Sequence, residues 1–397
     1  MIKQVVEFEP ITKDEIGEKA FSELETLAKS SHPILGYRRN GVLQARNYVG
    51  IIQTKSGFTL EILPKISKQE DIGRSKAIFL KMLKALPNSP YKHIDSAALK
   101  VQKFPLLEVF ISMFLQEVES IVKKGIKRDY ITKEENLRYL KGKLKISDHI
   151  RHNFIHKERF FVEYDEYLPD RVENRIIKTA LLYLSKLSTN FKNLQKIREL
   201  LFIFDEIGSI QEIKSSFTKV KKTRDINYYQ NALHWSRLFL LGQSPIPYSG
   251  DSISFAILFD MNRLFEAYVG KWIKQTRDDF GFESVVLQER RKYLFNEKIF
   301  SLQPDIIVNG GEFIFDTKWK IVRNEQEISR ADLYQIFSYA ARYEQCRKAF
   351  LVYPHVEDKV FRKKLTSNIG DRHVEFEVVY FNLENLDTNY DIMKHKL

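Results

Sequence analysis

The stretch 303–320, which reads QPDIIVNGGEFIFDTKWK, constrains the fold more than any other part of the chain. An apolar β-branched run at 306–308, the turn sequence NGG and a second extended run together predict a β-hairpin. Side chains two residues apart share one face of a strand. Asp316 and Lys318 should therefore lie together, and the hairpin should bring Asp305 beside them.

Two carboxylates and one ammonium at a single place require a chemical reason. Adjacent carboxylates repel each other, and one takes up a proton unless a cation lies between them. Mg²⁺ suits such a site because it accepts carboxylate oxygens and keeps positions for water and a phosphate oxygen. We therefore expect Asp305 and Asp316 to bind Mg²⁺, with the carbonyl of Thr317 as a third ligand and Mn²⁺ as a substitute ion. Lys318 would hold the attacking water in phosphodiester hydrolysis, with Lys320 as a reserve candidate for that role.

The same residues carry a family resemblance. Pro304-Asp305, ten intervening residues and then Asp316-Thr317-Lys318 resemble the PD-(D/E)XK signature of restriction-endonuclease-like nucleases. The alternative interpretation is an ordinary hairpin with solvated charges on one face.

Helices predicted on either side of the hairpin add two candidates. Upstream, the apolar spacing at 260–272 predicts a helix, and the resemblance implies that its Glu266 faces the metal site. A surface glutamate on an amphipathic helix is the alternative. Downstream, Gln335 and Tyr339 lie four apart on a predicted helix and resemble the Q-x-x-x-Y element of nucleases of the RecB branch. Glu266 and Gln335 would orient water, metal or phosphate.

Length and composition limit the remaining possibilities. A chain of 397 residues exceeds one ordinary core and predicts two or three domains. Its formal charge of +12 suits a polyanionic partner. The single cysteine, Cys346, excludes an internal disulfide framework. The charged N-terminus is unlike a signal peptide, and the apolar runs are shorter than a bilayer requires. We expect a cytoplasmic protein with no membrane partner.

Turn signals and periodicity divide the chain into three parts and predict an α+β multidomain fold. We expect a β-rich partner-binding domain at 1–95, a mainly helical region at 96–245 and a restriction-endonuclease-like α/β domain with a mixed central sheet at 250–397. Arg38 and Arg39 precede a predicted hairpin turn, and Lys141 and Lys143 lie in a basic and aromatic tract. Together with Tyr339, these residues are candidate contacts to DNA or a partner; the alternative for the cations is a solvated surface.

A second resemblance covers the first two parts. The segments YVGIIQ and LEILPKI, the segment RYLKGKL, and the segments YDEY and ENRIIK resemble McrC, the nuclease subunit of modification-dependent McrBC restriction systems. The resemblance implies a metal-dependent DNA endonuclease subunit that acts on modified double-stranded DNA in antiviral defence. It also implies coupling to a McrB-like hexameric AAA+ GTPase ring, whose NTP hydrolysis the subunit stimulates. The chain itself has no G-x-x-x-x-G-K-[ST] loop.

Two alternatives belong to other classes of function. A self-sufficient PD-(D/E)XK nuclease of DNA repair or defence would cut DNA without a ring partner. A non-catalytic DNA-binding motor activator would carry an inert acidic cluster and bind no Mg²⁺ through Asp305.

Overall fold

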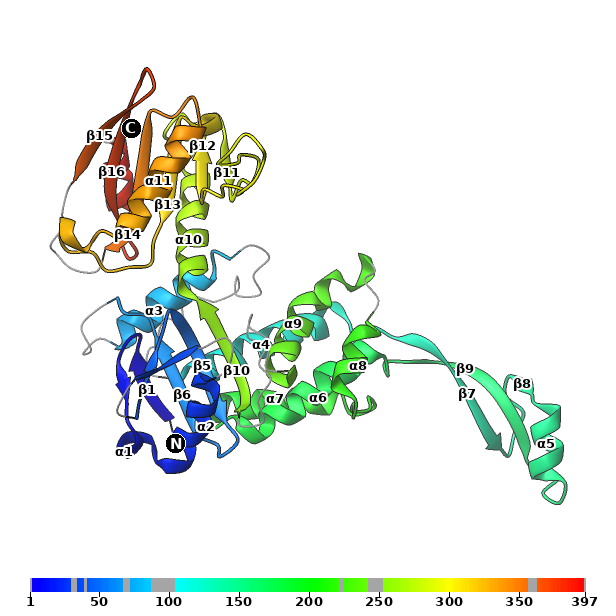
Figure 1. Cartoon of the computed structure of the whole chain (residues 1–397). Coiled ribbons are helices and arrows are strands. Elements are labelled where there is room, and N and C mark those ends of the chain that lie inside the picture. Colours follow the sequence, from blue (N-terminus) through cyan, green and yellow to red (C-terminus); the bar gives the residue numbers. More distant parts are fainter. Residues whose placement is uncertain are drawn as a thin grey trace. The chain divides into compact units, whose positions relative to one another are not determined.

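The computed structural model describes residues 2–29, 34–38, 41–66, 72–86, 104–220, 224–241, 253–355 and 363–395 (Figure 1). The chain forms two compact units, one comprising Met1–Leu106 with Ser244–Leu397 and the other Leu107–Gln243. The predicted α+β class is confirmed, because both units combine helices with sheets. None of the helices in the described ranges has the length and apolar character needed to span a bilayer.

The N-terminal part of the first unit is built on a four-stranded sheet. Its order is β1 (Ile2–Val6), β6 (Thr59–Leu63), β5 (Tyr48–Thr54) and β10 (Ile253–Asp260). β1 is parallel to β6, and the other neighbours are antiparallel. β5 and β6 are almost continuously buried and largely apolar, as expected for central strands covered on both faces.

Short elements complete this part of the unit. Helix α2 (Glu18–Ala28) packs on β5 and β10, and α3 (Ile72–Leu83) packs on β6. A one-turn helix, α1 (Lys13–Ile16), precedes α2. A small antiparallel sheet has the order β2 (Pro10–Ile11), β4 (Val42–Ala45) and β3 (Leu35–Arg38). The predicted strands at 48–54 and near 58–63 are confirmed.

The second unit ends at Gln243, close to the predicted domain boundary at 245–250. β10 lies after that boundary, yet it pairs with β5 of the N-terminal sheet. The two backbones approach closely at Gly50, where a Cβ atom would lie 2.0 Å from the Ile257 carbonyl oxygen and the φ angle is +135°. Glycine is required at such a position. The N-terminal sheet and the C-terminal α/β part thus belong to one unit, and β10 runs directly into helix α10 (Met261–Gln275).

The second unit contains a helical core. Its helices are α4 (Leu106–Lys124), α6 (Val172–Leu187), α7 (Phe191–Ile203), α8 (Ile213–Thr218), the 3₁₀ helix η2 (Arg224–Tyr229) and α9 (Gln230–Leu241). Aromatic rings of α4 and α9 meet in the core, where Phe110 lies 5.6 Å from Trp235 and Phe114 lies 5.9 Å from Phe239.

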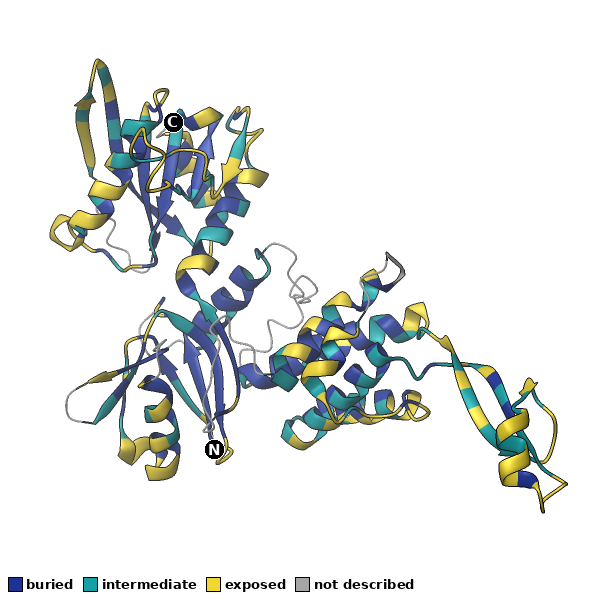
Figure 2. Ribbon diagram, turned by 45° about the vertical axis from the view of Figure 1, so that its right-hand side comes forward, coloured by how far each residue is buried: buried dark blue, intermediate teal, exposed yellow. Residues whose placement is uncertain are grey.

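A β-ribbon extends from these helices and adds strands to a region that otherwise consists mainly of helices. It consists of β7 (Asp129–Leu137), β8 (Lys143–Leu144), α5 (Ile146–Asn153) and β9 (Phe160–Leu168). β7 pairs with β9 over its whole length, and β8 adds to the other side of β9. β7 has no fully buried residue, and both faces of the ribbon are largely accessible, as the teal and yellow colours in Figure 2 show.

The C-terminal part of the first unit has the predicted mixed sheet. Its order is β11 (Val285–Leu287), β12 (Ile306–Val308), β13 (Phe313–Thr317), β14 (Lys348–His355), β16 (Arg372–Asn382) and β15 (Lys364–Ile369). β13, β14 and β16 are mutually parallel, whereas the outer pairs are antiparallel. Three helices accompany this sheet: α10, α11 (Arg330–Arg342) and α12 (Leu386–Lys394).

Helix α11 covers one face of this sheet. Ile336 and Tyr339 of α11 share a buried cluster with Ile307 of β12, Ile314 of β13 and Leu351 of β14. Side chains two apart share a strand face, so Asp316 lies on the same face as Ile314. The burial pattern of the helix therefore places α11 above the end of β13, where the acidic residues lie.

Candidate functional site

The hairpin that carries the predicted site is confirmed. β12 pairs antiparallel with β13, and a 3₁₀ turn, η3 (Asn309–Gly311), joins them. In this register Ile306 faces Phe315, so Asp305 stands opposite Asp316 at the open end of the hairpin. The two aspartates therefore lie beside each other, as the sequence pattern predicts.

Asp305 is tied to the neighbouring strand. Its Oδ2 accepts hydrogen bonds from the Thr317 amide at 2.6 Å and from the Thr317 hydroxyl at 2.8 Å. Burial raises the pKa of Asp305, and these two bonds oppose that rise. Thr317 thus orients Asp305 through its amide and hydroxyl, while the role of its carbonyl as a metal ligand stays a prediction.

Asp316 is a fully buried acid with few contacts that would stabilise its negative charge. Lys318 Nζ lies 2.5 Å from Asp316 Oδ2 as an ion pair, yet neither carboxylate oxygen has a hydrogen bond of normal geometry within the described residues. Burial, and then the charge of Asp305, raise the pKa of Asp316, whereas Lys318 lowers it. The protein alone therefore leaves this carboxylate undersatisfied, which is costly for a buried charge.

Glu266 of α10 lies in the electrostatic field of both aspartates. Burial raises its pKa to about 7, and the charges of Asp305 and Asp316 contribute to this rise. Gln288 Nε2 donates to Glu266 Oε1 at 2.7 Å, and the Gln288 amide donates to the Asp305 carbonyl at 2.8 Å. The structure thus brings Glu266 to the site, as expected, through a glutamine that sequence analysis missed.

Gln335 and Tyr339 occupy the next helix, α11. Gln335 Nε2 donates to the Tyr339 hydroxyl at 2.7 Å, which donates to the Gln303 carbonyl at 3.1 Å. Burial raises the pKa of Tyr339 to about 12, and the nearby acids Asp316, Asp305 and Glu266 contribute. The pair therefore supports the segment just before Asp305; direct contact with water, metal or phosphate stays a prediction.

Lys320 is held elsewhere. Its ammonium donates to both carboxylate oxygens of Asp332, a buried residue of α11, at 2.9 and 2.7 Å. This ion pair makes Lys320 a poor reserve for the catalytic cation, because its charge is already matched. Lys318 is the cation at the aspartate pair.

Two hollows meet at Asp305. The larger, of about 940 Å³, is bordered by Asp305, Glu266 and Gln288, and it also has four basic side chains, Arg263, Lys271, Lys274 and Arg290. The smaller, of about 480 Å³, is lined by Asp305, Gln335 and Tyr339 among others. The acids therefore face a hollow whose border is positively charged, as binding of a phosphate backbone requires. Sequence analysis missed these four cations, although three of them lie on the same helix as Glu266.

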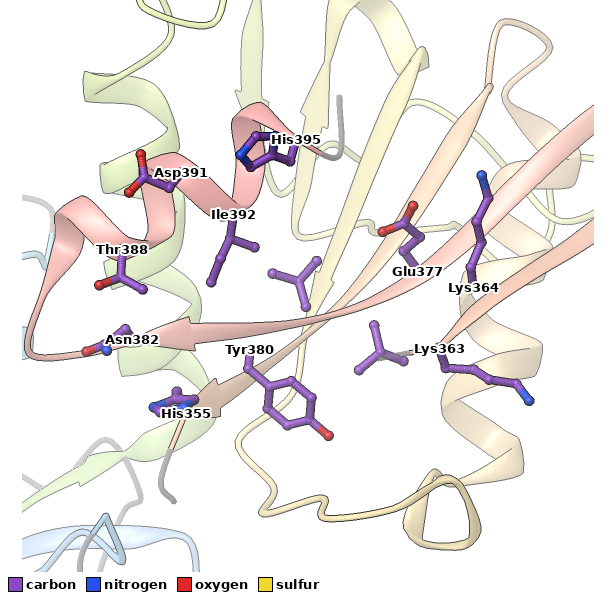
Figure 3. Close-up of a pocket in the computed structure, with 12 residues that line it drawn as sticks. His355, Lys363, Lys364, Glu377, Tyr380, Asn382, Thr388, Asp391, Ile392 and His395 are labelled. Carbon is purple, nitrogen blue, oxygen red and sulfur yellow. The ribbon is translucent and has the colours of Figure 1, made fainter. Parts of the chain in front are cut away.

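A further pocket lies apart from the site residues. It has about 740 Å³ and is formed by residues of β14, β15, β16 and α12, including Tyr380, Asp391 and His395 (Figure 3). None of the predicted site residues lines this pocket.

The remaining predicted contacts are four cations outside the acidic site, Arg38, Arg39, Lys141 and Lys143. Arg38 ends β3 and is exposed, while Arg39 lies outside the described residues. Lys141 and Lys143 belong to the ribbon, where Lys141 Nζ lies 3.8 Å from the centre of the Tyr164 ring and 3.9 Å from Glu166. A role of these cations in binding DNA or a partner stays a prediction.

The donor set fits a hard divalent cation. Within the described ranges, no three His, Cys, Asp or Glu side chains are arranged to enclose a metal ion. Asp305 and Asp316 supply two carboxylates, and within the described residues that of Asp316 has no hydrogen bond of normal geometry besides its ion pair with Lys318. Mg²⁺ commonly binds through one or two carboxylates and completes its shell with water and phosphate oxygens. The residues present therefore fit Mg²⁺ better than a metal that requires a full protein cage.

The fold and site define a class of multidomain α+β proteins that carry an acidic site on a hairpin of a mixed sheet. Residues 43–354 match the family model described as McrBC 5-methylcytosine restriction system component. The chain belongs to this family, and the predicted family resemblance is confirmed.

Solved structures share the fold. One, described as a half-complex from a tetradecameric assembly of Thermococcus gammatolerans McrB AAA+ hexamers with bound McrC, is 20% identical, covers 100% of both chains and has a TM-score of 0.74. A second, of the Thermococcus gammatolerans McrBC complex, is 23% identical, covers 70% of this chain and 88% of the other, and has a TM-score of 0.52. No curated protein sequence matches the chain significantly.

Proposed function

We propose that the chain is the Mg²⁺-dependent DNA endonuclease subunit of a McrBC-type restriction system and carries a PD-(D/E)XK site. The observation that carries this proposal is the buried Asp316 carboxylate, which lacks normal hydrogen bonds, stands opposite Asp305 and lies 2.5 Å from Lys318. A purely structural acid in this position would be expected to have hydrogen-bond partners.

The site residues divide the work of phosphodiester hydrolysis. Asp305 and Asp316 would hold Mg²⁺, which when bound supplies positive charge to a phosphate oxygen and makes water more acidic. Lys318 is placed to orient the attacking water beside Asp316. Glu266, with a pKa of about 7, can accept a proton near neutral pH, and Gln288 fixes its orientation.

Substrate binding follows from the charge around the larger hollow. Arg263, Lys271, Lys274 and Arg290 border it together with the acids. Contacts from such cations to phosphates position a duplex without reading its sequence. The chain would therefore hold and cut DNA, while recognition of a modified base would be left to the partner.

The ribbon of the second unit is our candidate for partner binding. Six large apolar side chains in the segment between β7 and β9 are exposed: Tyr139, Leu140, Ile146, Ile150, Phe154 and Ile155. Exposed apolar groups gathered in one segment are typical of interaction sites. The similar solved structure contains McrC bound to McrB AAA+ hexamers, which supports a McrB-like AAA+ ring as the partner of this chain. As part of the same proposal, the chain would stimulate GTP hydrolysis by that ring.

The test compares Asp316→Asn with the wild type in the presence of Mg²⁺, modified duplex DNA, GTP and a McrB-like ring. We expect cleavage to fall at least about 100-fold, because the change removes a metal ligand, while ring binding and stimulation of GTP hydrolysis persist. Asp371→Asn, at an exposed turn between β15 and β16, is the matched control.

The outcomes separate the candidate functions. Undiminished Mg²⁺-dependent cleavage by Asp316→Asn would refute the site assignment. Cleavage by the wild-type chain at the same rate without any ring would instead support a self-sufficient nuclease. Stimulation of the ring with no cleavage and no specific Mg²⁺ binding would support a non-catalytic activator.

A further inference from the structure

Trp319 connects the candidate site to another part of the unit. It directly follows Lys318 and is only 6% exposed. Its indole Nε1 donates to Glu7 Oε2 at 3.0 Å. The same ring packs on Phe265 of α10, with the ring centres 5.5 Å apart, and Phe265 precedes Glu266. One side chain thus contacts the N-terminal region and the helix that carries Glu266.

Glu7 is an unusual partner for this indole because it is a fully buried acid. It follows β1, where its amide donates to the Leu63 carbonyl at 2.9 Å. Its Oε2 also accepts a bond from the Lys65 amide at 3.0 Å, whereas Oε1 has no hydrogen-bond partner among the described residues. A buried carboxylate of this kind reduces stability. Its presence calls for a role other than stabilisation of the N-terminal sheet.

The N-terminal sheet also reaches the site by a covalent route. β10 is a strand of that sheet and continues directly into α10, which carries Phe265 and Glu266. At this junction the Met261 amide donates to the Asn47 carbonyl at 3.0 Å. The N-terminal sheet therefore fixes the start of α10 through the backbone, and Glu7 links the sheet to the segment that follows β13.

The segment after β13 needs such an anchor. β13 ends at Thr317, and the Lys318 amide still donates to the Val352 carbonyl at 2.9 Å. Beyond that point the side chains of Trp319 and Lys320 hold the segment through Glu7 and Asp332. Lys318 lies just before these two anchors, so a shift of either one would change the direction of its ammonium.

We propose that Glu7 is a positioning residue for Lys318, acting through its hydrogen bond to Trp319, and that the N-terminal sheet thereby sets the geometry of the nuclease site. This inference rests on the proposed nuclease function. The consequence is that the part of the chain containing β1 and β6 contributes to the rate of cleavage without touching DNA or metal.

The experiment measures single-turnover cleavage of modified duplex DNA by the whole chain with its ring, Mg²⁺ and GTP. Trp319→Phe keeps an aromatic side chain packed on Phe265 but removes the N–H donor, and Glu7→Ala removes the acceptor. Each is expected to lower the cleavage rate constant about 10- to 100-fold, because small misplacements of reacting groups have effects of this size. The DNA concentration for half-maximal rate should stay unchanged.

Three further variants exclude a merely structural effect. Glu7→Gln keeps a carbonyl acceptor and should restore the rate to within about threefold of wild type. Glu7→Ala combined with Trp319→Phe should be no slower than either single variant, because both remove one interaction. Trp272→Phe is the matched control: Trp272 is equally buried and packs on Phe381 at 5.2 Å, and its loss should leave the rate unchanged.

A spectroscopic readout makes the inference independent of cleavage. The chain has three tryptophans, so the ¹⁵N indole resonance of Trp319 can be assigned by its loss in Trp319→Phe. We expect Mg²⁺ to shift this resonance in the wild type and not in Glu7→Ala. A Trp319 resonance that is identical in the two proteins, with and without Mg²⁺, would overturn the inference.

Failure of the two proposals can be told apart. If Asp316→Asn cuts DNA normally, the nuclease site is wrong. If Asp316→Asn is inactive but Glu7→Ala and Trp319→Phe cut like the wild type, only the positioning role is wrong. A loss of rate in Glu7→Ala that Glu7→Gln does not restore would also contradict it.

Discussion

Replacing Glu7 by glutamine should raise the stability of the protein relative to the wild type as the pH rises. The Glu7 carboxylate is completely buried, and burial raises its pKa from 4.5 in the unfolded chain to about 7. The hydrogen bonds from Lys65 and Trp319 lower the pKa but do not cancel the effect of burial. In the folded wild type this group therefore binds a proton that the unfolded chain releases. Its contribution to stability falls as the pH rises from about 4.5 to about 7.

The magnitude follows from the pKa difference. One pKa unit corresponds to about 1.4 kcal/mol, so ionised Glu7 lowers the free energy of unfolding by about 3 kcal/mol at pH 8 and by about 1 kcal/mol at pH 5. Glutamine does not titrate, and its amide nitrogen would stand where Oε1 lacks a partner, at a constant cost of about 1–3 kcal/mol. Between pH 5 and pH 8, the free energy of unfolding of the variant should therefore rise by about 2.5 kcal/mol relative to that of the wild type.

The assay is urea-induced unfolding of both proteins, followed by tryptophan fluorescence at several pH values between 5 and 8. Trp319 contacts the substituted side chain, so its emission reports on the unit that contains Glu7. Other titrating groups are shared by the two proteins and cancel in the difference. Glu18→Gln, at an exposed position on α2, is the control and should show no comparable slope.

A difference between wild type and variant that stays constant from pH 5 to pH 8 would refute the reasoning. It would mean that Glu7 ionises in the folded protein as easily as in the unfolded chain. A wild type whose stability increases relative to that of the variant as the pH rises would be a stronger contradiction, because the carboxylate would then be stabilised in its charged form.

Two further predictions concern binding surfaces. Lys274→Ala and Arg290→Ala should each weaken DNA binding about equally for all sequences and reduce the slope of log affinity against log salt by about one; an unchanged salt dependence in titrations would remove the larger hollow from the DNA path. Leu140→Asp and Ile155→Asp should weaken binding to a McrB-like ring at least about tenfold, because interface cores exclude charge. Ile203→Asp, on the exposed end of α7, should not; equal binding by all three in pull-down or calorimetry would exclude the ribbon.

Sequence reasoning succeeded where the structure is local. The hairpin at 306–317 combines β-branched strands with an Asn-Gly-Gly turn, and its register alone places Asp305 opposite Asp316. Gln335 and Tyr339 meet because helical spacing puts residues four apart on one face. These contacts depend on strand pairing and helix periodicity, which a single sequence expresses directly.

The contacts that escaped prediction join distant segments. Glu7 and Trp319 are 312 positions apart in the sequence. No local sequence pattern indicates that a glutamate such as Glu7 is buried. Residues 253–260 fall within the predicted C-terminal domain, because nothing in their sequence specifies that they pair with β5. The ribbon escaped because its many charges obscure the alternation that a half-buried strand would show.

The pairing of β10 with β5 has a practical consequence for the design of protein fragments. A fragment that begins at the start of β10 would present an apolar strand without its neighbours, and a fragment that stops before it would expose the whole edge of β5. Unpaired edges of this kind promote aggregation. We therefore expect the C-terminal α/β part to fold only together with the N-terminal segment, either as two co-produced polypeptides or as one circularly permuted chain.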